Sequence, residues 1–178
     1  ISPHFAGRSF ERMVLDGGID GILKSHLVLD NHDTPRLTTL VPDPAARRLA
    51  RLLQFTLPGC PVIYYGSEVA MPGGADPTNR APMRWDLCND ANEELQLVKN
   101  LVAIRRANPA LVHGDYRALE SERLFAFLRV TEKPRETLLI LMNTAPHPVH
   151  DIIPIRDSRL MDAAQMECLL SGEHVTLH

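Results

Sequence analysis

The sequence predicts an α/β region with a parallel β-sheet, followed by a module of antiparallel β-strands. In the first region two short apolar runs, HLVLD and PVIYYG, are separated by a helical pattern. Strand, helix and strand in this order form a βαβ unit, in which the two strands are parallel. Beyond residue 113 the chain shows short strand-like runs separated by turn residues such as EKPRE and SGE, a pattern typical of antiparallel sheet.

The segment before the first strand carries a weak helical pattern. SFERMVLDG predicts one helix, Gly17-Gly18 interrupts it, and IDGILKS predicts a further helical turn. The run HLVLD, which begins at residue 26, is apolar without alternation. Such a run predicts a strand that is covered on both faces.

The helix between the two strands has start and stop signals. Asp43 is expected to cap its N-terminus, Pro44 suits its first position, and Pro58-Gly59 ends it. Apolar residues recur at helical spacing, and we expect three arginines on the opposite side. These residues are Ala46, Leu49, Leu53 and Leu57 on the apolar side, with Arg47, Arg48 and Arg51 opposite.

A long loop rich in glycine and proline, SEVAMPGGADPTNRAPMRWD, follows the second strand. A loop of about twenty residues inside a compact domain is usually functional or disordered. The next helix is expected to have Asp90 as its cap, because Glu93 three residues later completes a capping box. The strand-like runs that follow this helix are ERLFAFLRV, ETLLILMN, VHDIIPI, QMECLL and HVTLH.

Composition argues against several classes of partner. A net charge of −3 and a pI near 6.2 give no reason to expect nucleic acid or an anionic membrane. No apolar run approaches the ~18 residues that a membrane span requires, and no signal-peptide pattern opens the chain. The chain begins with Ile1 rather than Met, so we expect it to be part of a longer protein.

The three cysteines, Cys60, Cys88 and Cys168, form no CxxC or Cys/His pattern. We therefore predict free thiols in a reducing compartment, which favours the cytoplasm. The loops show no Asp-rich calcium pattern either. We expect neither a bound metal nor a cofactor.

The candidate site residues follow the two predicted strands. Ligands in parallel α/β sheets bind beyond the carboxyl ends of the strands, and in a βαβ unit both ends lie at one edge. NHDTPR follows the first strand and SEVAMPGGADPTNR follows the second. Because of this position, five polar residues are stronger site candidates than the other polar residues: His32, Asp33, Glu68, Asp76 and Arg80.

Each of these residues also has a purely structural interpretation. An Asp after a strand, such as Asp33, is often a cap or a turn residue, and a lone histidine such as His32 is often structural. Asp76 and Arg80 could form an ion pair that fixes the loop. Only the combination of these residues favours a functional site.

Three motifs in a fixed order resemble one enzyme family. HLVLDNHDTPR, PGCPVIYYGSE and GGADPTNRAPMRWD resemble the last third of the catalytic barrel in the α-amylase family, glycoside hydrolase family 13. The loops are most similar to the branch of neopullulanases, cyclomaltodextrinases and maltogenic amylases. The resemblance implies that residues 1–112 contain the last two βα units of a (β/α)8 TIM barrel. It also implies that residues 113–178 form an antiparallel β-sandwich (domain C), truncated at its end.

The resemblance also implies roles for individual residues. Asp33 matches the family's third catalytic carboxylate, which accepts hydrogen bonds from sugar hydroxyls and stabilises the transition state. His32 matches a histidine that donates a hydrogen bond to the same sugar. A carboxylate hydrogen bond that strengthens as the sugar ring flattens lowers the barrier by several kcal/mol. Asn31 belongs to the same motif, whereas Asp76 and Arg80 match residues that bind neighbouring glucose units. The implied substrate is an α-glucan or maltooligosaccharide.

One position departs from the family pattern, and two motifs are missing. The residue before Glu68 is commonly acidic in this branch, whereas here it is Ser67. Retaining glycosidases need a nucleophile and an acid/base carboxylate about 5 Å apart. The family's GxRxD-type and Glu-centred motifs, which supply them, do not occur in the 178 residues. The resemblance therefore predicts that the chain is the C-terminal fragment of a retaining enzyme, which hydrolyses or transfers α-glucosidic bonds. It also predicts that the fragment is inactive alone.

Other interpretations stay open. Asp33 and Glu68 could act as a pair themselves, since adjacent parallel strands lie about 4.8 Å apart. The chain could instead be a non-catalytic carbohydrate-binding or scaffold protein that retains barrel remnants, or a small unrelated α/β binding protein. Two strands without sheet neighbours would leave unpaired edges, from which we expect a homodimer.

Overall fold

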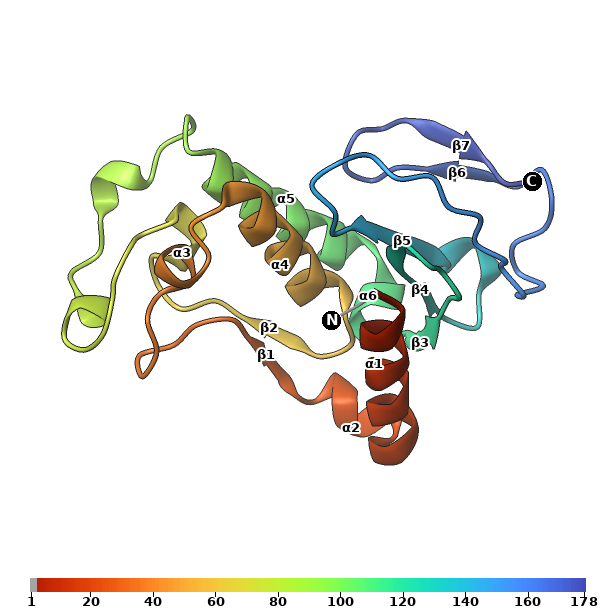
Figure 1. Cartoon of the computed structure of the whole chain (residues 1–178), viewed down its shortest axis with the longest axis horizontal. Coiled ribbons are helices and arrows are strands. Elements are labelled where there is room, and N and C mark those ends of the chain that lie inside the picture. The colour runs from red at the N-terminus through yellow and green to blue at the C-terminus, as the bar shows by residue number, and fades with distance from the viewer. Residues whose placement is uncertain (1–2) are drawn as a thin grey trace. The chain divides into compact units, whose positions relative to one another are not determined.

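The computed structural model describes residues 3–178, which fold into two compact units. One unit comprises residues 18–107, and the other combines residues 108–178 with residues 3–17. Figure 1 shows the helices and strands of both units along the chain. No helix among the described residues is long and apolar enough to cross a membrane. The expected family boundary between residues 112 and 113 stays a prediction.

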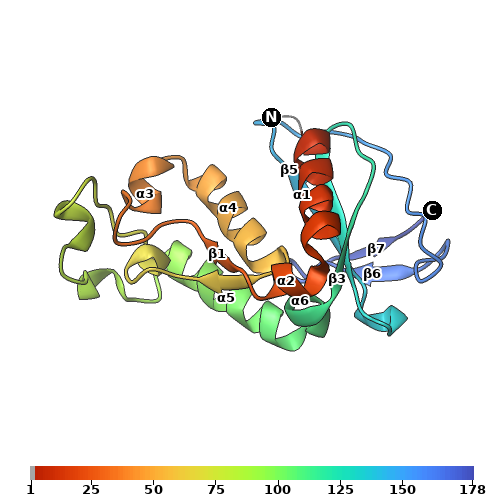
Figure 2. The same cartoon turned by 90° about the horizontal axis from the view of Figure 1, so that it is seen from below.

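The unit of residues 18–107 is built on two parallel strands. β1 (His26–Val28) and β2 (Cys60–Val62) pair over their whole length, and they run side by side in Figures 1 and 2. The chain passes between them through α3 (Leu37–Leu40) and α4 (Pro44–Thr56), which confirms the predicted βαβ order. Within the described part of the chain no sheet closes into a barrel.

The two strands are less covered than their apolar sequence predicts. Val28 is 44% exposed and Val62 is 36% exposed, because this sheet has only two strands in the described residues. The strands are nevertheless tied together through α4. The amide nitrogen of Gln54 donates to the carbonyl oxygens of Leu27 and Val62, each at 2.8 Å. Dimerisation through the exposed strand edges stays a prediction.

The N-terminal cap of α4 is the one that the sequence predicts, but the side of the helix that is buried is not. The Asp43 carboxylate accepts hydrogen bonds from the backbone N–H groups of Ala45 and Ala46, both at 3.2 Å, so the predicted cap is confirmed. The expected apolar stripe is only partly buried, whereas Arg47 and Arg51 are buried. Arginine tolerates such a position when protein oxygens satisfy its fixed set of donors.

The core of this unit lies between α4 and α5 (Glu93–Ala107), which Figure 1 shows side by side. Phe55, Val98 and Leu101 are buried there. Burial of each such side chain stabilises the fold by ~1.5–3 kcal/mol. The partly buried residues that pack against them are Leu52, Ile63, Leu97 and Val102.

The start of α5 differs from its prediction. The side-chain oxygen of Asn92 accepts a hydrogen bond from the backbone N–H of Leu95 at 3.1 Å, so Asn92 is the cap. Asp90 instead faces Lys99 at 3.6 Å. The predicted capping box of Asp90 and Glu93 is therefore wrong, because a turn before the helix places Asn92 directly ahead of its first residue.

Replacing Asn92 by alanine is expected to lower the free energy of unfolding by about 1–2 kcal/mol, because the first turn of α5 loses its cap. Replacing Asp90 by alanine is the matched control and should change this free energy by less than about 0.5 kcal/mol, as is usual for an exposed side chain. Urea denaturation followed by circular dichroism measures both. An equal loss in the two variants would restore Asp90 as the cap.

The second unit combines a helix with a three-stranded antiparallel sheet. α1 (Pro3–Gly17) confirms the predicted N-terminal helix of this unit, whereas α2 (Ile19–Leu23), the predicted further turn, belongs to the unit of residues 18–107. β3 (Asp115–Ala118), β4 (Leu124–Val130) and β5 (Leu138–Asn143) pair in this order. A short helix, α6 (Pro109–His113), precedes β3.

Aromatic rings form the contact between α1 and this sheet. The ring of Phe10 lies 4.8 Å from that of Tyr116, and the ring of Tyr116 lies 5.0 Å from that of Phe127. Phe127 in turn meets Phe125 edge-on, with ring centroids 5.5 Å apart. Such tilted and edge contacts stabilise a core beyond the area they bury.

Beyond β5 only part of the predicted strand pattern forms. β6 (Gln165–Glu167) and β7 (His174–Thr176) pair antiparallel, as two of the predicted runs indicate. The run VHDIIPI forms no strand. Its Asp151 carboxylate accepts hydrogen bonds from the Ser121 hydroxyl at 2.6 Å and the Arg123 backbone N–H at 2.9 Å, and its Pro154 lacks an N–H group for a ladder. The β-sandwich stays a prediction.

Candidate active site

The loops that follow β1 and β2 meet at the carboxyl ends of the two strands (Figure 1). The Asp33 carboxylate is the point of contact between them. Its Oδ1 lies 3.3 Å from Nη2 of Arg80, and its Oδ2 lies 3.2 Å from Nε2 of His32. The Asp33 side chain is 69% exposed, so its oxygens stay accessible to a ligand.

Arg80 connects Asp33 to a second carboxylate. Its Nε lies 3.3 Å from Oδ1 of Asp76, so one guanidinium bridges Asp33 and Asp76. Asn31 holds the same loop from the other side, because its Oδ1 accepts the backbone N–H of Asp33 at 2.8 Å. The structure therefore brings together Asn31, His32, Asp33, Asp76 and Arg80. Their donors and acceptors together suit an array of sugar hydroxyls.

Glu68 lies apart from this group. It belongs to η1 (Ser67–Val69), a single 3₁₀ turn after β2. Its Oε2 is buried and receives no hydrogen bond from the described residues. Its charge acts on the buried Arg51 instead, where it raises the pKa of the guanidinium against the stronger effect of burial. Among the described residues no hydrogen bond or ion pair joins Glu68 to Asp33, and a catalytic pair of these two carboxylates stays a prediction.

Asp30 is a buried site residue that the sequence analysis missed. It is 2% exposed, and its Oδ2 accepts hydrogen bonds from the backbone N–H of Leu37 at 2.8 Å and from the hydroxyl of Ser67. Ser67 is the residue that departs from the family pattern, and here it supplies a donor. An acidic side chain at that position would place a second negative charge against a buried carboxylate. An Asp that directly follows an apolar strand was the available signal.

Arg36 is a second missed residue, and it joins the loops of the site. It is fully buried, its backbone N–H donates to the Gly73 carbonyl at 2.9 Å, and Nη1 donates to the Tyr65 carbonyl at 2.5 Å. The guanidinium lies 4.7 Å and 4.6 Å from the ring centroids of Tyr64 and Tyr65. These cation–π contacts stabilise both rings. Burial, with the neighbouring Tyr65, raises the pKa of Tyr64.

Arg51 supports the same region from α4. Its Nη2 donates to the Ser67 carbonyl at 2.9 Å, and its Nε lies 4.0 Å from the Glu94 carboxylate. Burial lowers the pKa of Arg51, and the nearby charges of Asp30 and Glu94 oppose this effect. A buried cation among carboxylates thus lies next to the turn that follows β2.

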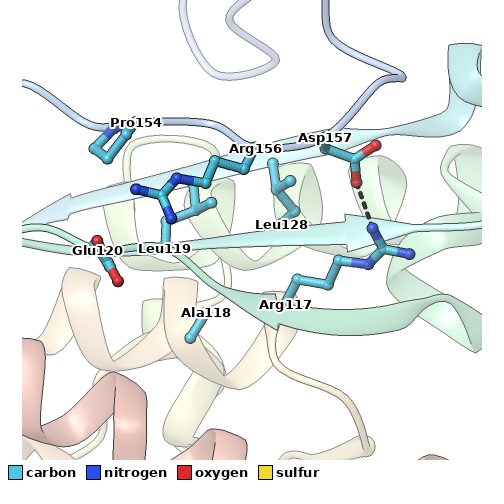
Figure 3. A pocket seen from close by; sticks show the side chains of 8 residues that line it. All are labelled: Arg117, Ala118, Leu119, Glu120, Leu128, Pro154, Arg156 and Asp157. Carbon is cyan, nitrogen blue, oxygen red and sulfur yellow. Dashed lines mark hydrogen bonds and ion pairs between the residues drawn. The ribbon is translucent and has the colours of Figure 1, made fainter.

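A cavity of about 170 Å³ lies in the other unit (Figure 3). None of the residues that line it is a predicted site residue. Across it Arg117 pairs with Asp157 at 2.6 Å. Burial would raise the pKa of Asp157, but the Arg159 backbone N–H and the two arginines lower it. Its eight lining residues include no aromatic ring that could stack on a sugar: Arg117, Ala118, Leu119, Glu120, Leu128, Pro154, Arg156 and Asp157.

Comparison with known proteins matches the region of the chain that contains both loops. Residues 19–93 match the family described as alpha amylase, catalytic domain. A cyclomaltodextrinase of a Bacillus species is 39% identical over 120 residues, which are 65% of this chain and 21% of that protein. Neopullulanase 2 of Thermoactinomyces vulgaris is 37% identical over 109 residues, which are 60% of this chain and 19% of that protein.

A solved structure extends the similarity beyond the strand pair. The α-amylase of Anoxybacillus covers 96% of this chain with a TM-score of 0.79 and 30% identity, and the match is 37% of that chain. This chain spans about a fifth of the length of the curated relatives. The family match makes residues 19–93 part of a glycoside hydrolase catalytic domain. These residues belong to the α-amylase family, glycoside hydrolase family 13, and the chain is similar to the cyclomaltodextrinase and neopullulanase branch.

Proposed function

We propose that this chain supplies the transition-state-stabilising carboxylate and the sugar-binding side chains of a retaining enzyme that cleaves or transfers α-glucosidic bonds. The substrate class is an α-glucan or maltooligosaccharide. The observation that carries the proposal is the exposed Asp33 carboxylate, which lies against His32 and Arg80 in the loop after β1, within the residues that match the α-amylase catalytic domain. Asp33 and His32 are the proposed catalytic residues, and Asn31, Asp76 and Arg80 the proposed substrate-binding residues.

The chemistry follows from charge and position. A glycoside transition state carries positive charge on a flattened sugar ring, and a carboxylate that binds its hydroxyls holds it more tightly than the ground state. Asp33 can do this because its backbone is fixed while its oxygens stay exposed. His32 supplies a ring nitrogen beside it, and Arg80 supplies donors that span two carboxylates. The nucleophile and the acid/base must come from the family's other motifs.

The isolated 178-residue chain is expected to show no hydrolysis of maltooligosaccharides, pullulan or cyclodextrins, because its sequence lacks the GxRxD-type and Glu-centred motifs that supply the nucleophile and the acid/base. Detection of released reducing ends measures this. Turnover that disappears in Asp33→Asn would contradict the expectation and support catalysis by this chain alone.

A chimeric enzyme tests the role itself. Residues 19–93 replace the matched segment of the Bacillus cyclomaltodextrinase, and the chimera is expected to hydrolyse cyclodextrins, with circular dichroism as the control for folding. A folded but inactive chimera would contradict the proposal. If the 178-residue chain then binds maltooligosaccharides in calorimetry, the non-catalytic carbohydrate-binding alternative gains support.

A further inference from the structure

We propose that Asn79 is a positioning residue for Asp33. Its side-chain nitrogen donates to the carbonyl oxygen of His32 at 2.8 Å and to that of Thr34 at 3.0 Å. These are the two residues that flank Asp33 in the chain. One amide group therefore holds the backbone on both sides of the carboxylate. The inference rests on the proposed function of Asp33.

The chemistry of this contact is specific to an amide. Asn79 is 1% exposed, and only its nitrogen, which carries two hydrogens, can face two carbonyl oxygens at once. On the remaining side of Asp33, the backbone N–H is held by Asn31. The peptide groups around Asp33 are thus fixed by buried or local hydrogen bonds, while the carboxylate itself stays exposed. A rigid backbone below a free functional group is the arrangement that preorganises a site.

The position of Asn79 is fixed by the 3₁₀ helix to which it belongs, η2 (Thr78–Arg80). The Thr78 hydroxyl accepts the backbone N–H of Gly74 at 3.0 Å and donates to the Ala75 carbonyl at 2.7 Å. A Cβ on Gly73 would lie 2.9 Å from the Asn79 Cα, so the backbones approach closely there. The same turn carries Arg80, whose guanidinium reaches the Asp33 carboxylate. One short turn therefore sets both the backbone of Asp33 and the cation beside its side chain.

Matched asparagines allow a controlled test. Asn79→Asp keeps the shape of the side chain but removes both donated hydrogen bonds, and Asn79→Ala removes them without adding charge, in case the first variant fails to fold. The control is Asn92→Asp. The Asn92 nitrogen also donates to two carbonyl oxygens, those of Val69 at 3.1 Å and Leu87 at 3.0 Å, in segments that do not include Asp33.

Amide hydrogen exchange in the 178-residue chain measures directly how firmly the backbone around Asp33 is held. In both Asn79 variants we expect exchange of the Asp33 and Arg36 amides to accelerate about tenfold or more, while amides in α4 keep their rates. Asn92→Asp should leave the Asp33 amide unchanged. Equal rates at Asp33 in wild type and both Asn79 variants would overturn the proposal, whatever the enzyme's activity.

Kinetics in the chimeric enzyme separate positioning from general stability. Both Asn79 variants should lower kcat about a hundredfold, as expected for a misplaced catalytic group, with KM changed by less than about threefold. Asn92→Asp should keep kcat within about twofold. A fall in kcat of equal size in Asn92→Asp would overturn the proposal. A wild-type chimera that folds but is inactive would contradict the proposed function instead, and leave the exchange experiment to decide on Asn79.

Discussion

Replacing Asp33 by asparagine in the chimeric enzyme is expected to lower kcat about a thousandfold or more while leaving the fold intact. The variant loses the charge that stabilises a positive sugar ring, an effect of several kcal/mol in this class of reaction. The fold should survive because the side chain is exposed and its contacts with His32 and Arg80 lie at the surface, where such contacts are each worth about 1 kcal/mol or less.

Two measurements make this result specific to Asp33. Steady-state kinetics on cyclodextrin give kcat, and thermal unfolding by circular dichroism shows that the midpoint is kept. Asp90→Asn is the matched control, since Asp90 is an exposed carboxylate of the same unit whose partners among the described residues are Lys99 and Gln96, neither of them a proposed site residue. If Asp33→Asn keeps more than about a tenth of the wild-type kcat, Asp33 is not the transition-state carboxylate.

Replacing Arg51 by methionine is expected to lower the free energy of unfolding by about 3–5 kcal/mol, the largest loss of stability that we expect from one substitution in this chain. Methionine fills much of the volume but donates nothing to the Ser67 carbonyl. It also leaves the buried carboxylates of Asp30 and Glu94 without their cation. An uncompensated buried charge is the reason for the size of the effect.

Arg48→Met is the matched control for this substitution, on the same helix. Arg48 is exposed and pairs with Glu93 at the surface, so its loss should change stability by about 1 kcal/mol or less. Urea denaturation of both variants, with comparison of their midpoints and slopes, measures the difference. Similar losses for Arg48→Met and Arg51→Met would show that burial does not decide the contribution of these arginines.

The features that the sequence predicted correctly depend on short stretches of chain. The cap at Asp43 needs only the three residues that follow it, and the βαβ order needs only the succession of apolar runs. The meeting of the loops at Asp33 and Arg80 follows from the fact that parallel strands end at one edge. Local rules of this kind hold without knowledge of the remaining chain.

The features that the sequence could not predict depend on distant partners. Helical spacing assigns Arg51 to the side away from the core, yet the carbonyl that accepts its hydrogen bond belongs to Ser67. Arg36 is buried because the Tyr65 carbonyl and two aromatic rings receive its guanidinium. Asn79 has no pattern that reveals its two acceptors, which precede it by more than forty residues. For such residues, only the folded chain identifies the partner.

The bridge that Arg80 forms between Asp33 and Asp76 has a consequence for ligand selection. These three side chains contact one another, at 3.3 Å on each side of the guanidinium. Under the proposed function, a sugar that donates a hydrogen bond to Asp33 displaces part of this arrangement. The free energy of binding is then the difference between the contacts that the three side chains form with the sugar and the contacts that they give up among themselves. Under the proposed function, a ligand whose hydroxyl spacing returns partners to all three side chains is expected to bind more tightly than one that satisfies Asp33 alone, by about 1 kcal/mol or less for each surface ion pair that the second ligand breaks.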